Sequence, residues 1–352
     1  MTPTSVTPNP VPPTSVPLPL VEHLHGQGAF CAGHGSPMYG QLCAFLADDV
    51  AAGGVVAELL KRWAAPTFGL DQLRREVPGL RLLGGLHRLV LTRRAPELAL
   101  FYPSVGGTGD VRDAWPVVRG ALLTHADELR EGLAQPPQTN EVGRAAPLLK
   151  GLGEIAVWTG GLPVRLVEIG TSAGLNLRVD QLPIGAGRLI DPGPDGLPRP
   201  DAPSYRVVSR VGGDLHPIDP TTPAGRTTLT SYVWPDDSVR FERLRVALDV
   251  ARAVPVDLRR VGAADLVEGL RLEAGTVTVL WHSVMWQYVG EPERERVRAA
   301  IERLGRDASA AQRFAHVRFE PAAAGDRHHE LSLDTWPGER GRLLGTAPPH
   351  GL

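Results

Sequence analysis

A segment in the middle of the chain carries one carboxylate, one hydroxyl and two glycines at two-residue spacing, in the residues Glu168, Gly170, Ser172 and Gly174. An apolar run at 164–169, rich in β-branched residues, comes before it, and apolar residues at helical spacing follow. This pattern predicts a strand, a tight turn and a short helix. Glycines let the main chain approach a ligand closely, and free N–H groups in a helix's first turn attract polar groups. The segment therefore predicts a ligand-binding loop, and Glu168 suits a cationic or hydroxyl-bearing ligand.

The spacing Glu-x-Gly-x-Ser-x-Gly resembles the first motif of class I S-adenosylmethionine-dependent methyltransferases, with Ser172 in place of the middle glycine. The resemblance implies an α/β fold with a Rossmann-like, seven-stranded sheet and S-adenosylmethionine as cofactor. In that family pattern, Glu168, Gly170, Ser172 and Gly174 frame the methionine end of the cofactor. The cysteine-poor composition and the near-neutral charge are compatible with such an enzyme in the cytoplasm.

Two aspartates follow later predicted strands and resemble further contacts of the same family. Asp214 stands where an acidic residue takes both ribose hydroxyls, a task that suits a carboxylate because it accepts several hydrogen bonds. Asp219 competes for this role, and a solvated turn aspartate is the alternative. Asp265 stands where an aspartate accepts from the adenine amine, although a helix N-cap explains it as well.

A histidine, His282, follows the fourth predicted strand, where the resemblance places substrate-facing chemistry. Histidine can act as a general base because its pKa lies near neutrality. The alternative is a histidine that is merely hydrogen-bonded at the end of a strand. Tyr288 and Glu320 are further candidates.

The elements that must position these residues fall into two parts. Residues 1–20 are expected to form a disordered arm, and 21–160 a mostly helical region whose first helix begins at Ser36-Pro37. Residues 161–352 alternate strand-like and helical runs and end in a hairpin around Pro337-Gly338, which predicts an α/β domain of seven strands. This order resembles the sheet of class I methyltransferases, which implies a methyltransferase-like Rossmann domain.

A polar segment at 138–144 comes shortly before the central strand and includes Asn140, Glu141 and Arg144. It could cover the ligand site, with Arg144 paired to Glu141 or to a carboxylate substrate, or it could be a capped helix start. Together with the central motif and Ser-Pro-Met-Tyr at 36–39, it resembles an uncharacterised, mainly actinobacterial family known as a domain of unknown function.

Two other classes of function remain open. Gly170-Thr171-Ser172-Ala173-Gly174 is also a G-x-S-x-G, the nucleophile elbow of α/β-hydrolases, which would make the chain a serine esterase or amidase. Its partners would be Asp257 or Asp265 with His316 or His350. That fold needs several strands before the elbow, whereas the preceding residues are mainly helical. The third possibility is a protein that binds the cofactor, or keeps the fold, without catalysis.

The composition narrows the partners. The 352 residues include 37 basic and 39 acidic side chains, so no bulk charge favours nucleic acid or an anionic membrane, and a small-molecule substrate is expected. Ligand-type residues gather at His23, His25, Cys31 and His34 and again at 328–330. Neither group has paired zinc spacing, so no metal is expected.

Overall fold

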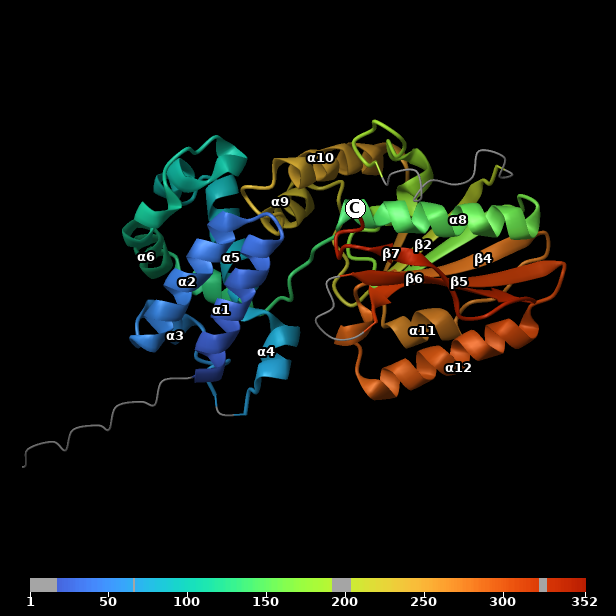
Figure 1. The fold of residues 1–352 in the computed structure, drawn as a ribbon, viewed down its shortest axis with the longest axis horizontal. Coiled ribbons are helices and arrows are strands. Elements are labelled where there is room, and N and C mark those ends of the chain that lie inside the picture. The colour runs from blue at the N-terminus through green and yellow to red at the C-terminus, as the bar shows by residue number, and fades with distance from the viewer. Residues whose placement is uncertain (1–17, 66, 192–203, 323–327) are drawn as a thin grey trace, which may run out of the picture. The chain divides into compact units, whose positions relative to one another are not determined.

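The computed structural model describes residues 18–65, 67–191, 204–322 and 328–352 (Figure 1). The chain forms two compact units, one comprising residues 1–86 and 95–136 and the other 87–94 and 137–352. Of the predicted arm, residues 1–17 lie outside the described residues, and 18–20 begin a helix. The division falls at residue 136, so the helix at 145–159 belongs with the sheet.

The described part of the first unit is helical. Its elements are α1 (Leu18–Gly33), α2 (Pro37–Ala51), α3 (Val55–Leu59), α4 (Leu70–Glu76), α5 (Pro78–Leu91, whose last turn belongs to the second unit), η1 (Pro96–Phe101), η2 (Pro103–Val105), η3 (Val111–Asp113), α6 (Trp115–Thr124) and α7 (Ala126–Leu133). Ser36 caps α2 as predicted, since its Oγ accepts from the Tyr39 N–H at 3.2 Å.

The prediction that the first helix begins at Ser36 was wrong, because α1 precedes it. The sequence of α1 contains glycines at 26, 28 and 33, which lower helix propensity. Gly28 has a packing reason: a Cβ there would lie 2.9 Å from the Cβ of Cys43 on α2. Tertiary contact therefore stabilises a helix that local propensity does not indicate.

The second unit contains one mixed sheet of seven strands in the order β3-β2-β1-β4-β5-β6-β7. The strands are β1 (Val164–Ile169), β2 (Val207–Asp214), β3 (Asp257–Arg260), β4 (Thr276–Ser283), β5 (Gln312–Pro321), β6 (His329–Trp336) and β7 (Arg342–Ala347). The first five are parallel, whereas β6 runs antiparallel to β5 and β7 antiparallel to β6. The predicted α/β class, the seven strands and the terminal hairpin are confirmed.

Helices cover both faces of the sheet (Figure 1). Side chains alternate along each strand, so Leu166 packs in the core on the side of α8 (Ala145–Thr159), and Val167 packs in the other core. That second core includes residues of α11 (Ala263–Glu268) and α12 (Glu291–Asp307). Central β4 is buried along its whole length, as expected of a parallel strand covered twice.

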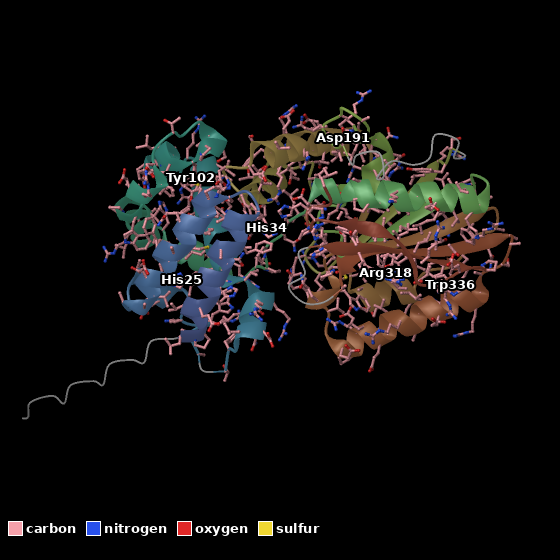
Figure 2. All side chains as sticks on the ribbon, viewed as in Figure 1. His25, His34, Tyr102, Asp191, Arg318 and Trp336 are labelled. Carbon is pink, nitrogen blue, oxygen red and sulfur yellow. The ribbon has the colours of Figure 1, made fainter. Side chains whose placement is uncertain are left out.

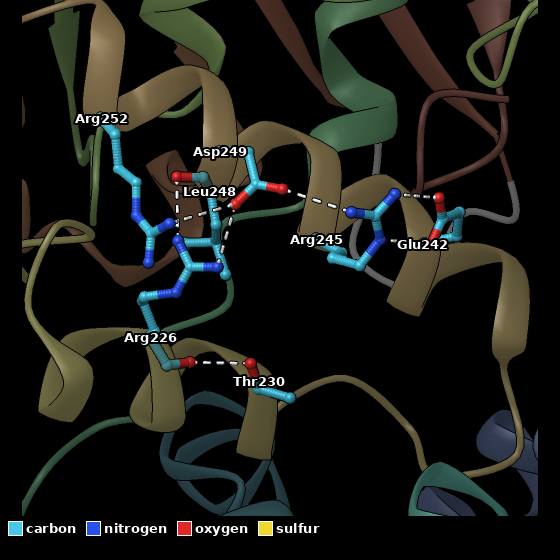
Figure 3. A network of polar contacts seen from close by, with 7 residues as sticks. All are labelled: Arg226, Thr230, Glu242, Arg245, Leu248, Asp249 and Arg252. Carbon is cyan, nitrogen blue, oxygen red and sulfur yellow. Dashed lines mark hydrogen bonds and ion pairs between the residues drawn. The ribbon is translucent and has the colours of Figure 1, made fainter.

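Two helices, α9 (Pro223–Ser231) and α10 (Ser238–Ala253), are linked by polar contacts (Figure 3). Arg226 donates from Nη1 to the Leu248 carbonyl at 3.0 Å and from Nη2 to Asp249 at 3.2 Å. Arg245 pairs along α10 with Glu242 at 2.6 Å and with Asp249 at 3.3 Å. Within the described ranges, no helix is both long and apolar enough to cross a bilayer.

Candidate functional site

Strand β1 lies between β2 and β4: the chain passes from β1 to β2 and β3 on one side and then crosses to β4 on the other side. In open α/β sheets the crevice at such a switch point, outside the carboxyl ends of the strands, is where ligands bind. Strands β1 and β4 are each followed by a non-glycine residue with a positive φ, 53° at Ser172 after β1 and 51° at Val284 after β4. Such conformations are rare, especially for a β-branched residue, and cluster at functional sites. Strain therefore marks the two loops at the switch point.

The loop after β1 needs its two predicted glycines. Gly170 and Gly174 have φ values of 67° and 65°, in the left-handed region. A Cβ on Gly170 would lie 2.9 Å from the Cβ of Met285, and one on Gly174 would lie 3.0 Å from Leu258. The loop is thus packed closely against the chain that follows β4 and against β3.

Free amides were expected in this loop, but protein acceptors engage five of them, those of Gly170, Thr171, Ser172, Gly174 and Leu175. Gly170 and Thr171 donate to the Gly213 carbonyl at 2.9 and 3.2 Å, and Gly174 donates to the Thr171 carbonyl at 2.8 Å. Side chains take two more: the Ser172 N–H donates to Asp214 Oδ2 at 2.9 Å, and the Leu175 N–H to Asn140 Oδ1 at 2.8 Å. The following helix, η5 (Asn176–Gln181), is a short 3-10 helix. A ligand at this loop would therefore depend on side chains more than on these five amides.

Arg178, which the sequence did not single out, holds the carbonyl side of the loop. Its Nη1 donates to the carbonyls of Gly174 at 2.7 Å and Ala173 at 3.4 Å, and its Nε donates to Val254 at 2.8 Å. Burial lowers its pKa to about 10. The signal available in the sequence was a lone arginine among the apolar residues at 175–179.

Glu168, the predicted acidic residue, is buried at the end of β1 with 2% exposure. Its Oε2 accepts from Thr171 Oγ1 at 2.6 Å, and its Oε1 accepts from Trp281 Nε1 at 3.1 Å. Burial raises the pKa of Glu168 to about 8, although these two hydrogen bonds oppose the shift, and the charge of Asp214 adds to it. The carboxyl group is therefore neutral at pH values below about 8.

Replacing Glu168 by glutamine should stabilise the protein, and the gain in melting temperature should grow from about pH 5 to about pH 8. Since the folded pKa lies near 8 and the unfolded one near ~4.3, the unfolded chain loses its proton first, and the native protein loses stability as pH rises through this window. Glutamine cannot ionise and still offers an acceptor and a donor to Trp281 and Thr171. Calorimetric melts across this range test this, with the exposed Glu242→Gln as control. A gain independent of pH contradicts a neutral Glu168.

The three predicted aspartates have different surroundings. Asp214 lies beside the loop, since its Oδ2 accepts from Ser172 and its Oδ1 from the His216 N–H at 2.8 Å. Asp219 instead holds a turn by accepting from the amide and hydroxyl of Thr221. Asp265 is exposed in the first turn of α11 and pairs with Arg296 of α12 at 2.6 Å. The structure thus brings Asp214 together with the loop and with Glu168, while Asp265 has its own partner.

His282 is buried at the end of β4, and its Nδ1 lies 2.7 Å from Glu320 Oε1 on β5. The same carboxylate oxygen accepts from the amides of Met285 at 3.1 Å and Trp286 at 3.3 Å. A carboxylate at Nδ1 favours the tautomer with the hydrogen on Nδ1, which leaves the Nε2 lone pair available as a base. Glu320 thus orients His282 in a form that can accept a proton.

The segment at 138–144 is tied to the loop after β1. Asn140 accepts from Leu175, and Asn176 Nδ2 donates to the Glu141 carbonyl at 3.2 Å. The side chain of Glu141 forms a buried ion pair with Arg240 at 2.6 Å, which holds the pKa of Glu141 near 2 despite burial. Arg144 Nε donates to the Pro349 carbonyl at 3.1 Å. The ion-pair partner of Glu141 is Arg240, on a helix about a hundred residues later, in place of Arg144. The alternative of a capped helix start fits, since Glu141 Oε1 accepts from the Gly143 N–H at 3.1 Å.

Ser172, the candidate nucleophile, meets no catalytic base in the part of the chain that the structure describes. Among the described residues its Oγ is buried and has no hydrogen-bond partner. Asp265 pairs with Arg296, and Asp257 pairs with Arg259 at 2.5 Å. His316 lies on β5, with its ring 5.1 Å from that of His282.

The predicted cluster of histidines and cysteine near the start of the chain lies on α1 and just after it. In the part of the chain that the structure describes, no group of three or more histidine, cysteine, aspartate or glutamate side chains is arranged to hold a metal ion. The adjacent residues at 328–330 precede and begin β6.

Fold and site together define an α/β protein with a mixed seven-stranded sheet and a polar candidate site at its switch point. The chain belongs to DUF2332, a family described as uncharacterized proteins conserved in bacteria, which matches residues 21–352. Neither a curated protein nor a solved structure matches the chain.

Proposed function

We propose that the chain is an S-adenosylmethionine-dependent methyltransferase that acts on a small molecule. The observation that carries this proposal is the bond between the Ser172 N–H and Asp214 Oδ2, 2.9 Å long, which joins the loop after β1 to the end of β2 at the switch point. In this crevice, the carboxylate of Asp214 would bind the ribose of a nucleoside ligand, and the loop after β1 would contact the methionine end.

The residues present can hold such a ligand through side chains. A carboxylate has about four lone-pair sites, and each oxygen of Asp214 accepts one hydrogen bond from the protein, so both can also accept from ribose hydroxyls. The buried Ser172 Oγ, without a partner among the described residues, can bond to the methionine end. Asp265 is engaged by Arg296, so we expect it to contribute little to binding the adenine.

When bound, S-adenosylmethionine supplies an electrophilic methyl group. The protein contributes position: the loop and Asp214 fix the donor, and the acceptor is held in line with it. His282 accepts the proton of the acceptor hydroxyl or amine, and Glu320 stabilises the imidazolium that forms. Incubation with tritiated S-adenosylmethionine and a protein-free bacterial extract tests this function. Label transferred to a small molecule supports it, and absence of transfer, with the protein folded, contradicts it.

The serine hydrolase alternative is less well supported, because among the described residues Ser172 Oγ has no hydrogen-bond partner and β1 is the first strand along the chain. Replacing Ser172 by alanine should leave the protein folded and weaken cofactor binding by less than about tenfold, since one neutral hydrogen bond is lost. The wild-type protein should not react with a fluorophosphonate. Labelling that disappears in the alanine variant would establish the hydrolase instead. The third alternative, a non-catalytic binding protein, predicts cofactor binding without transfer of label.

A further inference from the structure

A cavity of about 280 Å³ lies between α12 and strands β4, β5 and β6. Aromatic rings form much of its wall, with His282 and Trp286 near the end of β4, His316 on β5 and Trp336 at the end of β6. Ile301 of α12 closes it from the helix side. Figure 2 labels Trp336 and Arg318 in the part of the picture between the sheet strands and α12. Of the residues that line this cavity, the sequence had identified His282 as a possible base and His316 as a possible partner of Ser172.

Two polar side chains in the cavity wall have unused hydrogen-bonding atoms. His316 is 4% exposed, and its Nε2 is buried without a partner among the described residues. Arg318 uses only Nη1, which pairs with Asp334 and lies 3.3 Å from His316 Nδ1. Within the described chain its Nε and Nη2 form no bond, and these atoms form one edge of the fork that matches a carboxylate. Buried polar groups are normally satisfied, so the unpartnered His316 Nε2 indicates a ligand, and the open edge of Arg318, whose side chain is 31% exposed, lines the same cavity.

The charges of the wall select the ligand's charge. Three arginines line the cavity, Arg298, Arg318 and Arg340, against two carboxylates, Glu302 and Asp334. Burial lowers the pKa of His316 to about 3, so this ring is neutral at pH 7. Each arginine has a carboxylate partner: Arg318 pairs with Asp334, Arg340 with Glu302, and Arg298 with Glu291. The charges of the wall are therefore balanced, and an anion must use the edge of Arg318 that Asp334 leaves open. A monoanion places one charge on that edge, whereas a dianion would place a second charge near Glu302 and Asp334.

The size and the aromatic walls of the cavity indicate the uncharged part of the ligand. At about 280 Å³ the cavity is at the lower end for small-molecule sites, so it has room for one substituted ring and not for an adenosyl compound. Trp286 stacks on His282 with centroids 5.4 Å apart, and Trp336 stacks on Phe314 at 5.1 Å. Aromatic walls of this kind pack well against a flat ring.

We propose that this cavity binds a small aromatic monocarboxylate, with the carboxylate on the open edge of Arg318 and the ring among the aromatic side chains. Binding itself does not depend on methyl transfer. That the bound acid is the methyl acceptor, because the cavity reaches His282, rests on the proposed function.

Calorimetric titration of the full chain with benzoate, without any methyl donor, tests the binding step alone. Benzoate should bind, and neutral benzamide should bind at least about tenfold more weakly because it loses the charge-assisted bonds to Arg318. Cyclohexanecarboxylate, which is not flat, and the dianion phenylphosphonate should also bind more weakly than benzoate. Benzamide binding as tightly as benzoate, or no binding of benzoate, overturns the proposal. If benzoate does not bind, the proposed cofactor site is not affected, because binding of S-adenosylhomocysteine tests that site separately.

Two variants locate the ligand. Arg318→Gln should weaken benzoate binding at least about tenfold, and the matched Arg245→Gln, in the exposed ion pairs of α10, should leave it unchanged (Figure 3). Because Arg318→Gln leaves Asp334 without its cation, a second variant, Ile301→Phe, fills the cavity from α12 and should also abolish binding. Melting curves establish that each variant is folded. Benzoate affinity that is unchanged in folded Ile301→Phe overturns the assignment.

Discussion

Replacing Asp214 by asparagine should weaken the binding of S-adenosylhomocysteine by about a hundredfold or more, because hydrogen bonds to a charged acceptor are stronger than those to an amide and two ribose hydroxyls are involved. The amide has one acceptor oxygen in place of two, and in the wild type the carboxylate also receives Ser172 and His216. The substitution therefore weakens both the ribose contact and the bond that joins the loop to β2. Calorimetric titration of the wild type and the variant measures the effect.

The matched controls are the two other candidate aspartates. Asp219→Asn should bind normally, because Asp219 holds the turn at Thr221, whereas Asp214 is the aspartate that bonds to Ser172 of the loop. Asp265→Asn should change the affinity by less than about threefold, because Arg296 already engages its carboxylate. A large loss in Asp219→Asn with none in Asp214→Asn would transfer the ribose contact to Asp219 and contradict the assignment.

Replacing His282 by asparagine should lower the rate of methyl transfer by about a hundredfold or more while leaving the affinity for S-adenosylhomocysteine unchanged, because general-base catalysis typically contributes about that much. The reason lies in the geometry at β4, where Glu320 holds the Nδ1 side of the ring at 2.7 Å. Transfer of tritium to acceptors in a protein-free extract gives the rate, and calorimetry gives the affinity.

The variant Glu320→Gln distinguishes a catalytic His282 from a His282 that has only a structural role. This variant keeps the imidazole and removes the charge that stabilises its protonated form, so it should lose less rate than His282→Asn and shift the pH profile of transfer. Equal transfer rates in the wild type and in folded His282→Asn would show that His282 takes no proton. A loss of cofactor affinity in either variant would indicate a structural role instead.

The strands and the strained loop could be predicted because their signals are local. The β-branched run at 164–169 and the glycines after it identify β1 and its turn from adjacent residues, and the same holds for β4. Helix α1 was not predicted because packing, rather than local sequence, stabilises it. Gly28 weakens the helical signal of α1, yet it allows close approach to α2.

What surrounds the site residues could not be predicted, because the partners are distant in sequence. Glu168 bonds to Trp281, His282 to Glu320, and Glu141 to Arg240. Strand register or helix packing brings the two members of each pair together. The amides of Leu175 and Ser172 were expected to be free because their acceptors are also distant in sequence. The acceptors are Asn140 and Asp214, which lie 35 and 42 residues away. Residue types indicated the candidate site positions, and long-range contacts decide which of their groups remain available.

Hydrogen–deuterium exchange of the full chain, with and without saturating S-adenosylhomocysteine, tests most directly whether the switch point is the cofactor site. We predict slower exchange in the loop at 170–176 and in the segment at 214–217, where Asp214 and Ser172 meet. Little change is expected in α2 or in α12. Exchange that is unchanged in both segments, or protection confined to other parts of the chain, would contradict the account.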